Sequence, residues 1–297
     1  MKFDDSDGLA DYATDEPAVL APTVEVKSSR AGRNLPAAIG IGLALAGAAV
    51  ASLFIVKVAF LLLVMVVAAV GMLELARALR TAGIEVPLTP VLIGGGAMLV
   101  GSYVDGAETL AVALALAVLG TLVWRMSEGA DGFVRDVSAG VFTLAYIPLL
   151  GSFVILMVAE DDGPWRIVAF VLVTVMSDTG GYIVGVLFGK HPMAPAISPK
   201  KSWEGFAGSL IAGTVAGILI VVLALDGRWW AGLILGVAAV LFGTLGDLCE
   251  SLIKRDLGIK DMGNLLPGHG GAMDRLDSLL AVAPVAWVVM HYLVSVT

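Results

Sequence analysis

Long apolar runs, separated by short polar connections, occupy most of the chain after residue 34. A run of about 20 apolar residues is long enough to cross the ~30 Å hydrocarbon core of a bilayer as a helix. The polar interruptions mark the limits of each run. The pattern therefore predicts an all-α polytopic membrane protein with about nine transmembrane helices. These spans are expected at residues 35–53, 55–77, 88–104, 107–125, 137–158, 165–189, 205–225, 229–250 and 277–296.

Lys and Arg are concentrated in alternate connections, before the first span and after the second, fourth, sixth and eighth spans. Since cytoplasmic loops carry the excess of Lys and Arg, we expect the N-terminus in the cytoplasm and the C-terminus outside. The composition agrees with a membrane protein, because 58% of the residues are hydrophobic, 15% are charged and the mean hydropathy is +0.93. Ordinary soluble domains are less apolar.

The polar segments divide the chain into three regions. Residues 1–34 are acidic and then basic, contain no apolar run, and are expected to form a disordered cytoplasmic tail. Residues 35–160 are predicted to form N-terminal transmembrane helices that serve packing, dimer contacts or lipid access. Residues 161–297 are predicted to form a catalytic transmembrane region with two long cytoplasmic loops, 190–204 and 251–276.

Three carboxylates flank the second of these loops. Asp247 lies near the end of the eighth span, and Asp274 and Asp277 lie where the ninth begins. The chain has one cysteine and three scattered histidines, which disfavours a thiolate or imidazole metal site built from neighbouring residues, so a metal would be bound by oxygen. Asp247 and Asp274 are expected to share one Mg²⁺, which takes one or two carboxylates together with substrate phosphates. The structural alternatives are a solvated helix end at Asp247, and a glycine turn followed by an Asp that caps the next helix.

Basic residues accompany both loops. Lys254, Arg255, Lys260 and Arg275 would neutralise polyphosphate charge, which is typical of phosphoryl or nucleotidyl transfer.

In the earlier loop, hydroxyl and ammonium groups suit phosphates, and an acidic side chain behind them can accept hydrogen bonds. These residues are Ser198, Lys200, Lys201, Ser202 and Glu204. Asp178, inside the sixth span, is a functional candidate because a carboxylate within the membrane is costly. The alternative is that the lysines of this loop only mark its cytoplasmic side, beside a Trp203 that lies at the membrane interface.

The stretch "SLIKRDLGIKDMGNLLPGHGGAMDRLDS", residues 251–278, closely resembles the signature of the phosphatidate cytidylyltransferases. The segments "SDTGGYIVG", "FGKH" and "ISPKKSWEG" resemble the other conserved blocks of that family. The resemblance is strong over residues 170–280, and the earlier spans resemble the family in hydropathy alone. Gly181 departs from the alanine that is more usual there.

The resemblance implies a dimeric, multi-pass enzyme of the inner membrane with its active site facing the cytoplasm. It would convert CTP and phosphatidic acid into CDP-diacylglycerol and pyrophosphate with Mg²⁺ bound by Asp247 and Asp274. Some family members hold K⁺ beside Mg²⁺, and the resemblance admits K⁺ here. The implied partners are CTP, phosphatidic acid and a second copy of the chain, and no nucleic acid.

Residues and resemblance together assign roles to two sets of side chains. The catalytic set is Asp247, Asp274, Lys254 and Arg255. The substrate-binding set is Asp178, Ser198, Lys200, Lys201, Ser202, Glu204, Lys260, His269, Gly270, Gly271, Arg275 and Asp277. Two alternatives stay open. A CTP-dependent lipid kinase of the dolichol-kinase type would transfer the γ-phosphate, and a transporter would explain the spans and Asp178 but not the charged loop.

Overall fold

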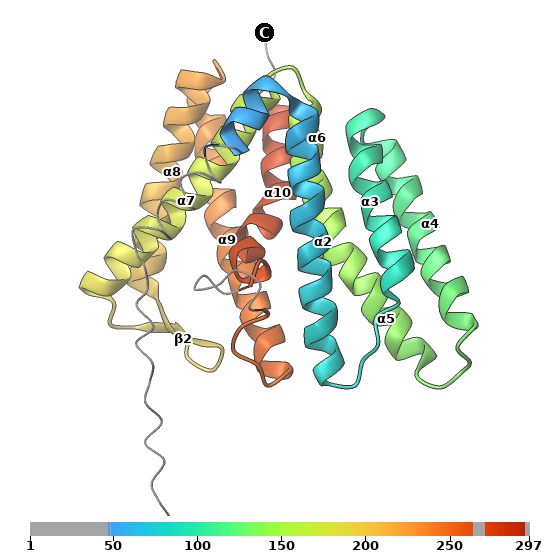
Figure 1. The fold of residues 1–297 in the computed structure, drawn as a ribbon. Coiled ribbons are helices and arrows are strands. Elements are labelled where there is room, and N and C mark those ends of the chain that lie inside the picture. Colours follow the sequence, from blue (N-terminus) through green and yellow to red (C-terminus); the bar gives the residue numbers. More distant parts are fainter. Residues whose placement is uncertain (1–46, 48, 264–270, 295–297) are drawn as a thin grey trace, which may run out of the picture.

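The chain folds into a bundle of helices (Figure 1). The structure is a computed structural model, which describes residues 47, 49–263 and 271–294. The helices are α2 (Lys57–Thr81), α3 (Leu88–Val104), α4 (Ala107–Met126), α5 (Phe133–Leu144), the π-helical turn η1 (Ala145–Leu149), α6 (Leu150–Ala159), α7 (Gly163–Phe188), α8 (Trp203–Ala224), α9 (Trp229–Asp256) and α10 (Met273–Leu293). The strands are β1 (Pro192–Ala194) and β2 (Ser198–Ser202).

Eight of the nine predicted spans coincide with helices in the described part of the chain. The first, 35–53, falls largely outside the described residues. Within the described ranges, seven helical segments are long and apolar enough to cross a membrane, with α5, η1 and α6 counted as one. Helix α3, with 17 residues, is shorter. A multi-pass membrane protein is therefore confirmed, as is its mainly helical character.

Two local features differ from the sequence expectations. The loop 190–204 contains an antiparallel pair of strands in which Pro192 pairs with Ser202. Prolines at positions 192, 195 and 199 disfavour a helix in this loop. They are tolerated in a two-stranded sheet, because both of its strands are edge strands. Helix α9 also continues six residues into the predicted loop 251–276. Residues 251–257 contain no glycine or proline, and the helix ends just before Gly258, whose φ of +66° suits a helix end.

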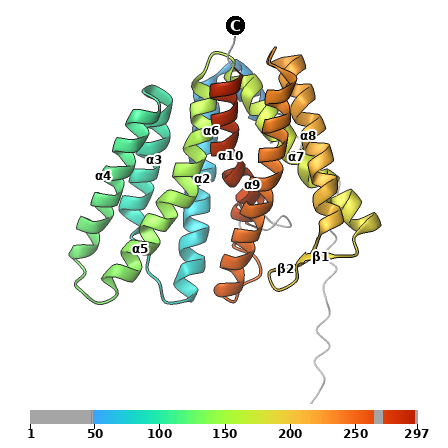
Figure 2. The same cartoon turned by 180° about the vertical axis from the view of Figure 1, so that it is seen from behind.

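The helices form three groups, as Figures 1 and 2 show from opposite sides. Helices α7, α8 and α9 lie on one side, α3, α4 and α5 lie on the other, and α2, α6 and α10 lie between them. One buried cluster joins α7, α9 and α10 through residues such as Phe170, Val173, Leu235 and Val282. A second joins α2, α3, α6 and α10, and it includes Met273. Helix α10 belongs to both clusters and therefore connects α7 and α9 with α2, α3 and α6.

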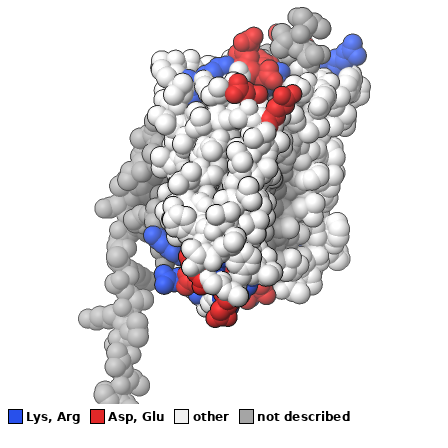
Figure 3. All heavy atoms as spheres, turned by 90° about the vertical axis from the view of Figure 1, so that its right-hand side faces the viewer, with Lys and Arg blue, Asp and Glu red and all other residues white. Residues whose placement is uncertain are grey.

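The surface has the charge distribution of a membrane-spanning protein. Figure 3 shows a broad band without charged residues, with Lys, Arg, Asp and Glu gathered at its two ends. The β-hairpin and the connections after α2 and α4 lie at the same end of the molecule, the lower end in Figure 1. The connections after α3, α6 and α8 lie at the opposite end. The basic connections of the sequence thus share one face.

Helices α8 and α9 cross on glycines, which brings their backbones together. A Cβ at Gly232 would lie 2.6 Å from the Cα of Ile218, and one at Gly236 would lie 2.5 Å from the Cα of Thr214. Real Cβ atoms do not approach backbone so closely, so larger residues would force the helices apart. This crossing matters because α9 carries Asp247 and α8 follows the hairpin.

We therefore expect Gly232→Ala to lower the stability of the folded protein by roughly 1–3 kcal/mol through overpacking. Gly120→Ala, in α4, is the matched control, because a Cβ there meets no atom within 4 Å. Thermal unfolding of both variants in detergent measures the difference. Equal midpoints would show that the α8–α9 crossing tolerates a methyl group.

Candidate functional site

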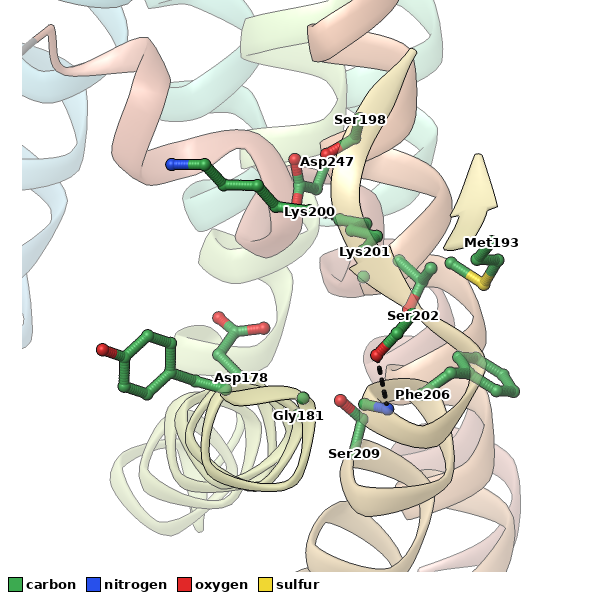
Figure 4. A pocket seen from close by; sticks show the side chains of 15 residues that line it. Asp178, Gly181, Met193, Ser198, Lys200, Lys201, Ser202, Phe206, Ser209 and Asp247 are labelled. Carbon is green, nitrogen blue, oxygen red and sulfur yellow. Dashed lines mark hydrogen bonds and ion pairs between the residues drawn. The ribbon is translucent and has the colours of Figure 1, made fainter. Parts of the chain in front are cut away.

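A cavity of about 370 Å³ lies between α7, the hairpin, α8 and α9 (Figure 4). Its wall includes seven residues that the sequence singled out in the sixth and eighth spans and in the loop 190–204, namely Asp178, Gly181, Ser198, Lys200, Lys201, Ser202 and Asp247. Figure 4 shows Asp178 projecting from α7 and Asp247 from α9, with Lys200 and Lys201 extending from β2. The fold thus gathers carboxylates and ammonium groups from segments about 70 residues apart.

Close packing of α7 against α8 forms one wall of the cavity. A Cβ at Gly180 would lie 2.7 Å from the carbonyl oxygen of Gly208, and one at Gly181 would collide with the hydroxyl of Ser209. The Ser209 hydroxyl in turn donates to the carbonyl of Ser177 at 2.8 Å. The alanine that is more usual at position 181 would therefore collide with Ser209 on the facing helix, whereas Gly181 leaves room for it.

Hydrogen bonds at the base of the hairpin fix its direction. The Ser202 hydroxyl accepts from the Gly205 N–H at 3.1 Å and caps α8. The Glu204 carboxylate accepts from the N–H groups of Lys190 and His191 at 3.1 and 3.2 Å, and its other oxygen lies 2.5 Å from His191 Nδ1. Ser202 and Glu204 therefore hold the hairpin that presents the two lysines, and Glu204 does not line the cavity.

An ion pair in the cavity wall links the hairpin to α9. Lys201 Nζ lies 2.5 Å from Asp247 Oδ2, and both side chains are partly exposed. The Ser251 hydroxyl, one turn along α9, lies 3.5 Å from the other Asp247 oxygen. Asp247 thus has its cationic partner on β2.

A second cluster lies where α9 meets the start of α10. Lys254 Nζ lies 2.7 Å from Glu250 Oε2 and 2.9 Å from Asp274 Oδ1. The i, i+4 spacing of Glu250 and Lys254 on α9 places the two side chains on one helix face and favours this ion pair. The second Asp274 oxygen accepts from the N–H groups of Met262 and Gly271 at 3.2 and 3.0 Å. Asp274 thus ties both ends of the α9–α10 connection to α9.

Asp277 and Ser278, in the first turns of α10, join the two clusters. The Ser278 hydroxyl lies 3.5 Å from Asp178 Oδ2. A Cβ at Gly246, which directly precedes Asp247, would lie 2.5 Å from the Asp277 carbonyl oxygen, so the first turn of α10 packs against α9 beside Asp247. Both clusters therefore belong to one site spread over α7, β2, α9 and α10.

The oxygen donors of this site fit a hard divalent cation. Asp247 and Asp274 offer carboxylates, each of which has a lysine partner in this structure. Among the described residues, no three His, Cys, Asp or Glu side chains converge into a complete metal-binding group. A cation here would therefore complete its shell with water or with ligand oxygens, as Mg²⁺ commonly does.

Several predicted site residues lie elsewhere or outside the description. Arg255 and Lys260 are exposed and do not line the cavity. Arg275 is exposed on the first turn of α10. Gly271 is buried beside Asp274. His269 and Gly270 lie outside the described residues.

Other residues were missed by the sequence reasoning. The cavity wall also contains Tyr182, Met193, Phe206, Ser209 and Thr244, which no local motif singles out. Glu74, 1% exposed within α2, accepts from the N–H of Met273 at 3.0 Å. Its signal was present, because a carboxylate within an apolar span is a functional candidate.

Comparison with known proteins decides the family. A model of the cytidylyltransferase family matches residues 36–293. The chain belongs to this family. A phosphatidate cytidylyltransferase of Mycobacterium leprae is 44% identical over 280 residues, covering 89% of this chain and 90% of that protein. Another, of Mycobacterium bovis, is 43% identical over 280 residues, covering 90% and 92%.

More distant relatives match a shorter part. A phosphatidate cytidylyltransferase of Staphylococcus saprophyticus is 39% identical over 150 residues, or 50% of this chain and 57% of that protein. Membership in the cytidylyltransferase family confirms the resemblance in the signature and makes the chain a nucleotidyltransferase enzyme. It also extends the likeness to α2–α6, where the sequence showed only hydropathy.

Proposed function

We propose that this protein transfers the cytidylyl group of CTP to phosphatidic acid, with CDP-diacylglycerol and pyrophosphate as products. The match to phosphatidate cytidylyltransferases over 89–90% of the chain carries this proposal. The site agrees with it, because Lys200, Lys201 and two carboxylates surround a cavity within an apolar bundle. Such a site suits a polyphosphate beside a lipid.

In this reaction, a phosphate oxygen of phosphatidic acid forms a bond to the α-phosphorus of CTP. The bond from that phosphorus to the oxygen bridging it to the β-phosphate breaks, and pyrophosphate leaves with the electron pair. The attacking oxygen is already anionic, so no protein nucleophile is needed. The protein contributes by positioning the reactants and offsetting charge.

The lysines of the site are placed to exchange partners. In the structure, Lys201 pairs with Asp247 and Lys254 pairs with Asp274. We propose that Asp247 and Asp274 hold Mg²⁺, which would offset the charge of the phosphates. Lys201 and Lys254 would then be available to the phosphate oxygens of the substrates.

The lipid substrate is proposed to enter from the side. Along α7, beside the cavity, Ile183, Val186 and Leu187 are exposed. Such apolar residues at the bundle surface suit contact with acyl chains. By the Lys and Arg distribution, the hairpin end would face the cytoplasm, where CTP is present. The resemblance adds an inner-membrane location, a homodimer and an optional K⁺ to the proposal.

Labelled CTP distinguishes this reaction from that of a lipid kinase. With purified protein, phosphatidic acid and Mg²⁺, label on the α-phosphate should enter the lipid, and label on the γ-phosphate should appear in pyrophosphate. Transfer of the γ-label to lipid, with release of CDP, would instead identify a kinase. Solute uptake into proteoliposomes without CTP turnover would identify a transporter.

A further inference from the structure

Glu74 lies in the middle group of helices, outside the residues that touch the cavity. We infer that Glu74 is a positioning residue, which holds the start of α10 and thereby places the Asp274 carboxylate for catalysis. This inference rests on the proposed function for the role of Asp274. The contact itself stands on the geometry of α2 against α10.

Helix α2 holds Met273, the first residue of α10, in two ways. Glu74 Oε2 accepts the Met273 N–H at 3.0 Å, and a Cβ at Gly71 would lie 3.0 Å from the Met273 sulfur. Met273 is fully buried. The N–H groups of the first helical turn have no partner within the helix, and a carboxylate there also complements the helix dipole. Glu74 thus supplies, from 199 residues away, the acceptor that α10 lacks.

Two glycines fit around the same carboxylate. A Cβ at Gly263 would lie 2.5 Å from Glu74 Cδ, and one at Gly271 would lie 2.9 Å from Glu74 Oε2. Larger residues at these positions would displace Glu74. The backbone of the α9–α10 connection therefore passes close to Glu74 at two positions, Gly263 and Gly271.

Asp274 binds the same part of the connection. Its Oδ2 accepts from the N–H of Met262, next to Gly263, and from the N–H of Gly271. Glu74 and Asp274 therefore contact adjacent points of one backbone segment. Since Met273 precedes Asp274 directly, a shift of Met273 would move the Asp274 carboxylate relative to Lys254.

The burial of Glu74 argues for a specific role. A carboxylate within a membrane-spanning segment is costly, and Glu74 Oε1 accepts no hydrogen bond from any described residue. An apolar side chain would pack against the neighbouring core at less cost. The contacts with the α9–α10 connection are what an apolar residue could not provide.

The test compares Glu74→Gln, which keeps an oxygen acceptor, with Glu74→Leu, which does not. The assay measures CDP-lipid formed from CTP and phosphatidic acid with Mg²⁺ by the full chain in detergent. We expect Glu74→Leu to lower kcat by about 100-fold with less than about a threefold change in the KM for CTP, because a misplacement near 1 Å costs about that much. Glu74→Gln should retain kcat within about fivefold.

Leu75→Ala is the matched control, because Leu75 is fully buried on the same helix but belongs to the core cluster. It should lower the thermal unfolding midpoint and leave kcat near that of the unchanged protein. A loss of kcat in Leu75→Ala as large as in Glu74→Leu would reduce the role of Glu74 to general stability and overturn the inference. So would near-normal kcat in Glu74→Leu.

Hydrogen exchange gives a readout that does not depend on activity. The Met273 amide should exchange at least about tenfold faster in Glu74→Leu, where its acceptor is absent, than in Glu74→Gln or Leu75→Ala. Unchanged exchange would refute the contact. If the unchanged protein makes no CDP-lipid, the proposed function fails, whereas the exchange result still decides whether Glu74 holds α10.

A second route applies if Glu74→Leu does not fold. The three nearest atoms to a Cβ at Gly263 all belong to Glu74. Gly263→Ala should therefore lower kcat by at least about tenfold, and the shorter side chain of Glu74→Asp should recover part of that loss in the double variant. If the losses of kcat in the two single variants simply multiply in the double variant, positions 74 and 263 are not coupled. That outcome would count against the inference.

Discussion

Asp274→Asn is expected to remove nearly all product formation, with kcat lowered by about 10³-fold or more while the protein stays folded. The carboxylate is the proposed Mg²⁺ ligand on α10, and it also pairs with Lys254 at 2.9 Å. The amide of asparagine is a poor ligand for Mg²⁺, and loss of metal-assisted charge stabilisation accounts for an effect of this size. The measurement is CDP-lipid formation over a range of Mg²⁺ concentrations.

Asp105→Asn makes the same chemical change at the opposite end of the bundle, where Asp105 ends α3 in an exposed position. It should leave turnover unchanged. Unfolding midpoints must be compared, because Asp274 also accepts two backbone N–H groups. Near-normal turnover of Asp274→Asn at any Mg²⁺ concentration would remove Asp274 from the metal site.

Lys254→Met is expected to have the largest effect on stability. Lys254 lies between Glu250, whose side chain is 1% exposed, and Asp274. Removing the cation leaves a buried carboxylate without its partner, which costs about 3–5 kcal/mol. Unfolding in detergent should show this loss, and CDP-lipid formation should fall with it because Asp274 loses its neighbour.

The double variant Glu250→Leu with Lys254→Met tests the origin of that loss. It replaces the pair by apolar residues, so it should be more stable than Lys254→Met alone. If the double variant is less stable than the single one, the burial of Glu250 is not what makes Lys254 necessary. Its turnover should stay low, because Asp274 still lacks the ammonium group.

The fold could be predicted well where it depends on local patterns. Apolar runs gave the helices to within a few residues, because length and hydropathy are sufficient to specify a membrane span. The β-hairpin was missed, since strands of three and five residues with prolines carry no alternating pattern. The extension of α9 was missed because Glu250, Lys254, Arg255 and Asp256 end the apolar run, so hydropathy ends the span before the helix itself ends.

The candidate site was predictable in its residues but not in its pairings. Asp178, Lys201 and Asp247 were named from local context, and the fold places them around one cavity. That Lys201 pairs with Asp247 depends on packing between segments 46 residues apart. Glu74 could have been singled out as a carboxylate within an apolar span, but its contact with Met273, 199 residues away, could not be predicted. Contacts of that kind leave no periodic trace in a sequence.

The depth of the cavity has an electrical consequence. Asp178 precedes Phe188, the end of α7, by ten residues, or about 15 Å of helix. Beyond it, toward the other end of the bundle, come the buried apolar residues Phe170 and Val173. If the cavity is filled with water, the membrane potential falls mainly across that remaining apolar part, at about 2.3 kcal/mol per elementary charge for each 100 mV. The packing around Phe170 then forms the low-dielectric layer across which that potential falls.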